Sequence, residues 1–189
     1  MGFAPSYRES GSRAYRDVML LEAGCLDRPV SACHLKGATA DGALARETYA
    51  ASSVVATEPL ADGAIDVLVS GIEHATTGGA AVLIDALGGA VARLAPDATA
   101  FPHRNAFAVV QLIASSASAS TGDASLKWLA ETTGQTRKRA GTAAYANYPN
   151  ADFTDWRAAY YGANYGRLQQ IKTQYDPDRL FDFPQAVGS

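Results

Sequence analysis

Cysteine, long apolar stretches and clustered positive charge are all scarce in this chain of 189 residues. Its two cysteines, Cys25 and Cys33, are too few for a disulfide framework, so we expect reduced thiols and a cytoplasmic location. The longest apolar runs, such as residues 80–87, are far too short to cross a bilayer. The first residues also lack the apolar stretch of a secretory signal. We therefore expect no membrane partner.

Basic side chains form no extended cluster. The formal net charge is −3, and the visible positive group is the short run Arg137, Lys138 and Arg139. A nucleic-acid-binding protein generally presents a basic face to the phosphates, so we predict no nucleic-acid partner. Hydrophobic residues make up 48% of the chain and charged residues 19%, which indicates a globular protein able to bury a substantial core.

The spacing typical of metal sites is missing as well. His34, His74 and His103 are scattered along the chain. Cys25 and Cys33 are not followed by a second Cys/His pair at the spacing of a zinc site, so we predict no metal. The sequence also contains neither a glycine-rich phosphate loop nor a Gly-x-Ser-x-Gly nucleophile motif.

Apolar periodicity and turn residues predict a mixture of helices and strands. Helical spacing of apolar residues predicts helices over residues 15–25 and 62–74, and a further helix is expected from about Asp123. In the helix over residues 62–74, Asp62 should cap the start, and the buried face should consist of Ile65, Leu68, Val69 and Ile72. Continuous apolar or β-branched runs predict strands over residues 31–35, 48–56, 80–87 and 106–114.

The last third of the chain should contain a strand and two short helices. Residues 142–148 alternate enough to predict a strand, which Pro149 ends. Asp152 should cap a helix that ends at Gly162. The next helix should start at Asn164, with an inner face of Leu168, Ile171 and Tyr175. Strands and helices do not alternate regularly, so we predict an α+β fold with an antiparallel sheet flanked by helices.

Tyr145 and Asn147 are the strongest candidates for a functional site. Two residues apart on a strand, they would project from one face. A phenol and a carboxamide on one wall could orient and deprotonate a hydroxyl substrate, or hold the edge of a heteroaromatic ring. Alternatively, the tyrosine packs in the core and the asparagine closes a turn.

The region that contains this pair carries a family resemblance. Six of the nine tyrosines lie between Tyr145 and Tyr175, within AAYANYPNADFTDWRAAYYGANYGRLQQIKTQYDPDRLFDFPQAV. This order resembles the C-terminal signature of the berberine-bridge-enzyme-like family of FAD-linked oxidases. The resemblance extends from about Tyr15 to about Val187 and is strongest after Thr142.

The resemblance implies roles for three residues. Tyr145 matches a tyrosine that serves in some members as the base for the substrate hydroxyl, and Asn147 matches an asparagine near the flavin ring. His103, in a Pro-His-Arg segment similar to one in the family, would be structural or contact the substrate. The resemblance also implies the fold of the family's substrate-binding domain. We expect a loose segment over residues 1–14, that domain over 15–141 and the berberine-like segment over 142–189.

Three functions stay open at this point. The family's FAD-binding elements are not in this sequence, and side chains cannot replace the flavin in hydride transfer, so we do not expect the chain to oxidise a substrate alone. It could be the substrate-binding portion of an oxidase of small molecules in secondary metabolism, truncated or split, that needs a flavin-binding partner. It could instead be a flavin-free isomerase, dehydratase or cyclase with Tyr145 as acid or base. The third possibility is a non-catalytic binding protein or remnant, and self-association is a further alternative for the partner.

Overall fold

The computed structural model describes residues 10–35, 42–45, 47–75, 79–116 and 119–188. The chain divides into two compact units, an N-terminal unit that ends at Glu47 and a C-terminal unit that begins at Thr48. The predicted division at residues 141–142 stays a prediction. None of the helices in the described ranges is long and apolar enough to span a membrane.

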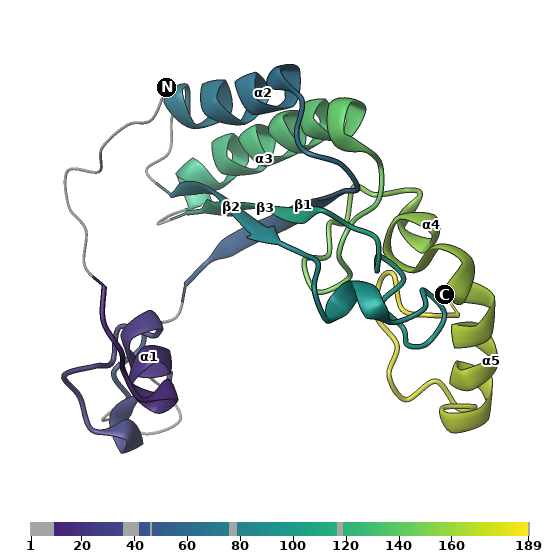
Figure 1. The fold of residues 1–189 in the computed structure, drawn as a ribbon, viewed down its shortest axis with the longest axis horizontal. Coiled ribbons are helices and arrows are strands. Elements are labelled where there is room, and N and C mark those ends of the chain that lie inside the picture. The colour runs from purple at the N-terminus through teal and green to yellow at the C-terminus, as the bar shows by residue number, and fades with distance from the viewer. Residues whose placement is uncertain (1–9, 36–41, 46, 76–78, 117–118, 189) are drawn as a thin grey trace. The chain divides into compact units, whose positions relative to one another are not determined.

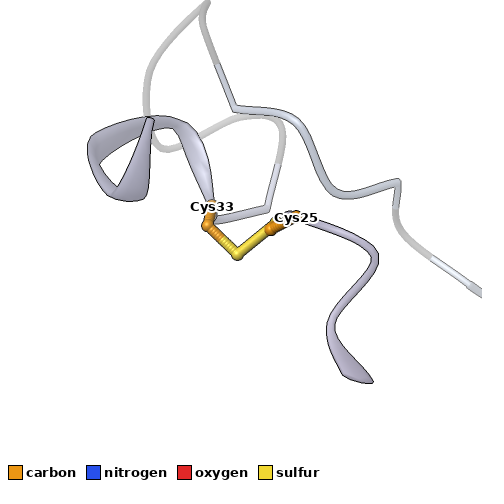
Figure 2. The surroundings of a disulfide bond; sticks show 2 residues. All are labelled: Cys25 and Cys33. Atoms are coloured by element: carbon orange, nitrogen blue, oxygen red, sulfur yellow. A yellow bond between two sulfur atoms is a disulfide. The ribbon is translucent and has the colours of Figure 1, made fainter. Parts of the chain in front are cut away.

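The N-terminal unit contains helix α1 (Tyr15–Glu22) and the short 3-10 helix η1 (Val30–Ala32). The expected reduced thiols are wrong, because Cys25 and Cys33 form a disulfide with their Cα atoms 5.9 Å apart (Figure 2). The predicted strand over residues 31–35 is also wrong. Pro29 starts a tight turn there, in which its carbonyl accepts a hydrogen bond from the Ala32 amide. The segment pairs with the chain near Leu44 only through an isolated bridge at Leu35, not as a strand.

The C-terminal unit is built on a three-stranded antiparallel sheet. Its strands are β1 (Tyr49–Ala56), β2 (Ala80–Ala86) and β3 (Ala108–Ser115), in the order β1-β3-β2. All three lie within two residues of their predicted bounds, and the predicted α+β class with an antiparallel sheet is confirmed. In the register, Val110 faces Val54 on β1 and Ile84 on β2.

Helices α2 (Asp62–Glu73) and α3 (Ala119–Ala140) lie side by side over one face of this sheet (Figure 1). Leu112 of β3, Leu68 of α2 and Trp128 of α3 are buried in the core between them. The Trp128 indole donates a hydrogen bond of 2.6 Å to the carbonyl of Gly71, which joins the two helices. Helix α3 starts at Ala119, a few residues before the start predicted at about Asp123.

The predicted inner face of α2 is only partly correct. Leu68 is buried, but Ile65, Val69 and Ile72 are between 41% and 50% exposed. The helix packs against α3 and β2, and these three side chains stay partly exposed beside that contact. Asp62 does not cap the helix, because Ala61 occupies the N-cap position and no side chain caps the helix there.

Residues 142–148 do not form the predicted strand. The Ala143 carbonyl accepts one hydrogen bond from the Val55 amide of β1, at 2.8 Å. The next amide, that of Ala144, donates instead to the carbonyl of Ala159, at 2.9 Å. The backbone then turns, with the Tyr148 amide donating to the Tyr145 carbonyl at 3.0 Å. Pairing with β1 thus stops after one hydrogen bond.

Two short helices complete the C-terminal unit. Helix α4 (Trp156–Tyr161) starts later than predicted, with Asp155 rather than Asp152 at its N-cap position, and a 3-10 turn η3 (Gly162–Asn164) leads into α5 (Tyr165–Tyr175). The predicted inner face of α5 is not a buried face. No residue of α5 is fully buried: Leu168 is partly buried, whereas Ile171 and Tyr175 are 40% and 77% exposed.

Asn150 connects helix α4 and the C-terminal segment to the sheet through hydrogen bonds. Its amide group donates to Ser52 on β1, at 2.9 Å, and its backbone amide donates to the Tyr160 hydroxyl, at 2.8 Å. Its side-chain oxygen accepts from the Asp152 amide, and its backbone carbonyl accepts from the Gln185 side chain. One buried asparagine therefore connects β1, α4 and the C-terminal segment.

Candidate functional site

Tyr145 is held against strand β1 by its own backbone. Its amide donates to the Ser53 hydroxyl, at 2.8 Å, and the adjoining Ala143 carbonyl pairs with the Val55 amide. The turn to Tyr148 then brings the chain back over the sheet face formed by Val55 and Val109. The Tyr145 side chain is therefore fixed over the face of the sheet opposite helices α2 and α3.

Asn147 and Tyr145 are in direct contact. The Asn147 amide nitrogen donates a hydrogen bond of 2.8 Å to the Tyr145 hydroxyl oxygen. A turn brings the two side chains together, rather than the strand that the sequence suggested. This bond uses an acceptor position of the phenol and leaves its proton to be donated elsewhere. The pair can therefore orient an oxygen-bearing ligand.

Aromatic rings form a wall beside this pair. The ring of Tyr145 meets those of Phe101 and Tyr148 edge to face, at centroid distances of 5.6 and 5.3 Å. Such contacts stabilise a pair of rings by about 0.5–1.5 kcal/mol beyond burial and restrict how the rings can turn. The wall is thus a defined apolar surface with a phenol hydroxyl at its edge.

A cavity of about 290 Å³, which we call the Tyr145 cavity, lies against this wall. Its polar lining residues are Asp85, Arg104, Tyr145 and Tyr148, and its apolar ones are Leu87, Val91, Phe101 and Val109. Burial raises the pKa of Tyr148, and the nearby Asp85 carboxylate adds to this, so its phenol stays protonated at neutral pH.

Asn147 lines a different, larger cavity of about 650 Å³, which residues of β1, β3, α3 and the segment 147–152 surround. Tyr148 lines both cavities, so the two are neighbours. Asn147 is exposed. The hydrogen bond to Tyr145 engages its amide nitrogen and not its carbonyl oxygen, which can therefore accept a hydrogen bond from another group.

His103 lies behind the wall and is not among the lining residues of these two cavities. Its Nε2 donates to the carbonyl of Ala144, at 2.9 Å, and its ring meets that of Phe101 edge to face. Burial lowers the pKa of His103, against the opposing effect of the backbone hydrogen bonds. A contact between His103 and a substrate therefore stays a prediction.

Asp85, Arg104 and Phe101 line the Tyr145 cavity but were not predicted as site residues. They come from the end of β2 and from the loop before β3, so only the fold brings them to Tyr145. Arg104 follows His103 in the Pro-His-Arg segment, which was the one signal in the sequence. Within the described residues, no group of three His, Cys, Asp or Glu side chains is placed to hold a metal ion.

Comparisons with known proteins agree on one family. Residues 144–188 match the family described as berberine and berberine like. The chain is 34% identical over 131 residues to the uncharacterized FAD-linked oxidoreductase YgaK of Bacillus subtilis, covering 69% of this chain and 29% of that protein. It is 33% identical over 104 residues to a chitooligosaccharide oxidase of Gibberella zeae, covering 52% of this chain and 21% of the oxidase.

The fold agrees with a solved structure of the same group. The BBE-like 1 protein of Physcomitrella patens superposes with a TM-score of 0.75 at 24% identity, covering 92% of this chain and 36% of that structure. The chain thus spans about a third of the length of the relatives it matches, and their flavin-binding region lies outside the matched part. The chain therefore belongs to the berberine-bridge-enzyme-like family of FAD-linked oxidases and corresponds to the C-terminal third of its members.

Proposed function

We propose that this chain forms the substrate-binding wall of a FAD-linked oxidoreductase that acts on a small molecule. The observation that carries the proposal is the Tyr145 hydroxyl, which accepts a hydrogen bond from Asn147 and lines a cavity of about 290 Å³. Ligand sites are commonly apolar hollows of a few hundred Å³ with a few convergent polar groups. The homology to FAD-linked oxidoreductases supports the reaction class.

Tyr145 is the proposed base. With its oxygen fixed by Asn147, it can exchange a proton with a substrate hydroxyl in the Tyr145 cavity. The exposed Asn147 amide suits the polar edge of a flavin ring, because its carbonyl oxygen can accept a hydrogen bond from a ring N–H. FAD, when bound, would take the hydride that the chain's own side chains cannot accept.

The flavin would be supplied by a flavin-binding part outside these 189 residues, on the same polypeptide or on a partner. Three large apolar side chains of the C-terminal segment support such a contact. Leu180, Phe181 and Phe183 are each at least 61% exposed, although they lie within four positions of one another. Exposed apolar groups gathered in this way are typical of an interaction surface.

A flavin-free enzyme is the second candidate. The observation that favours it is the volume of the Tyr145 cavity, about 290 Å³, which is in the range of a small-molecule site. In that case Tyr145 would act as acid or base in an isomerisation, dehydration or cyclisation of a small molecule. A colourless preparation with turnover would support this function, whereas a yellow complex with a flavin spectrum would support the first.

The test of the proposed role is Tyr145→Phe in the flavin-loaded assembly, obtained by co-expressing the chain with its neighbouring genes. Removing the hydroxyl should lower kcat by about 10²- to 10⁴-fold, with little change in KM, because proton transfer contributes about that much. The matched control is Tyr175→Phe, which removes a hydroxyl from an exposed side chain and should leave turnover unchanged. Unchanged turnover in Tyr145→Phe would eliminate the base assignment.

A further inference from the structure

Arg104 is a buried cation with few hydrogen-bond partners among the described residues. Its side chain lies in the loop before β3, and the residue is only 9% exposed. Within the described residues, its guanidinium donates one hydrogen bond, from Nη2 to the hydroxyl of Thr99. Its Nε is buried and has no hydrogen-bond partner among the described residues, and its Cζ lies 5.1 Å from the centroid of the Phe101 ring. The residue forms no ion pair with any described carboxylate.

This environment is costly for a charge. A guanidinium stays protonated in proteins and carries five N–H donors, so burial without an anion costs several kcal/mol. Buried arginines are accordingly almost always paired. Asp85 lines the same cavity but forms no ion pair with Arg104, and it is exposed. The charge of Arg104 is therefore uncompensated by the part of the chain that the structure describes.

Arg104 is also a lining residue of the Tyr145 cavity. An anion in this cavity would lie beside the guanidinium, and Tyr145 and Tyr148 line the same cavity. A carboxylate fits best, because its two oxygens match the planar fork of a guanidinium. The rings of Phe101, Tyr145 and Tyr148 offer an apolar surface to the rest of such a molecule.

We propose that the Tyr145 cavity binds small ring compounds that carry a carboxylate, and that Arg104 is the residue that selects the acid. The inference rests on the proposed function, since it names the substrate class of the same site. Arg104 would hold the acid group while Tyr145 addresses an oxygen elsewhere on the ligand. Substrates without an acid would lose the contact that offsets the buried charge.

The experiment is a calorimetric or NMR titration of the 189-residue chain with benzoate and with benzyl alcohol, which have the same ring. Benzoate should bind at least about tenfold more tightly than the alcohol, because hydrogen bonds to charged groups contribute about 1.5–3 kcal/mol. Arg104→Gln should remove this preference. The matched control is Arg93→Gln, which changes an exposed arginine that is not a lining residue of the cavity and should bind benzoate like the wild type.

Arg104→Lys keeps a charge and covers the case in which Arg104→Gln does not fold, as judged by circular dichroism. It should retain part of the preference for benzoate. Equal binding of the two probes to the wild type would overturn the acid selectivity and leave the cavity as a ligand site. Unchanged benzoate binding in a folded Arg104→Gln would overturn the role of Arg104. Binding of neither probe would overturn the inference and count against the proposed function as well.

Discussion

His103 contributes to the site through its contact with the backbone beside Tyr145. Its Nε2 donates to the carbonyl of Ala144, the residue that immediately precedes Tyr145. Burial holds the pKa of His103 below its ordinary value of 6.5, so the ring is neutral at pH 7 with its proton on Nε2. In this state it acts as a positioning residue for the Tyr145 segment.

The lowered pKa of His103 predicts that stability falls in acid. The unfolded chain takes up a proton at His103 as the pH drops below 6.5, whereas the folded chain takes it up only at a lower pH. The free energy of unfolding should therefore decrease from about pH 7.5 to about pH 5.5, and His103→Gln should make this decrease shallower. Urea unfolding at a series of pH values would measure it. An identical pH dependence in the variant would contradict the account.

Single residues also show how far the site could be predicted from the sequence. Tyr145 and Asn147 are close in sequence, so their contact could be anticipated even though the strand assigned to them was wrong. Arg104 and Asp85 reach the same cavity from distant segments, and their place depends on the register of β2 and β3. The spacing of residues along the chain therefore does not predict that these two residues line one cavity.

At the scale of elements, local patterns predicted those parts whose hydrogen bonds are regular. The three sheet strands and α2 follow from apolar runs bounded by turn residues. Residues 142–148 have a strand-like composition, but their amides bond to α4, to a side chain of β1 and to their own turn. These competing hydrogen-bond partners come from tertiary structure, which local patterns do not predict. The disulfide between Cys25 and Cys33 in the N-terminal unit is likewise a contact that the local pattern did not predict.

The contact between α2 and α3 depends on the missing side chain of Gly71. A Cβ built at this position would lie 2.9 Å from Cγ2 of Thr132, a buried and β-branched residue of α3. The carbonyl of Gly71 itself accepts the hydrogen bond from the Trp128 indole. The two helices can therefore approach this closely only with glycine at position 71.

Gly71→Ala should destabilise the protein by about 1–3 kcal/mol, because Thr132 cannot turn away easily and the helices must separate. Chemical denaturation gives the change in the free energy of unfolding. The control is Gly134→Ala in α3, where an added Cβ would meet nothing within 4 Å. That variant should gain about 0.5–1 kcal/mol from better helix propensity. A Gly71→Ala protein as stable as the wild type would contradict the close packing.

At the scale of the whole molecule, apolar side chains remain exposed on several elements. They include Ile65, Val69 and Ile72 on α2, Leu83 and Ile84 on β2, and Leu180, Phe181 and Phe183 near the C-terminus. The chain matches about a third of the length of its relatives. We therefore expect part of this surface to be covered when the flavin-binding part is present. Helical periodicity identifies the apolar face of a helix but not whether another element covers it. For this reason the periodicity overestimated the buried faces of α2 and α5.

The most direct test of the central claim is the visible absorbance spectrum of the purified chain after equilibration with FAD and removal of unbound cofactor. We predict that the 189-residue chain alone is colourless, because it provides the substrate side of the site and not the flavin-binding region. The same chain isolated together with a flavin-binding part should show a flavin spectrum. FAD held tightly by the lone chain would contradict the account.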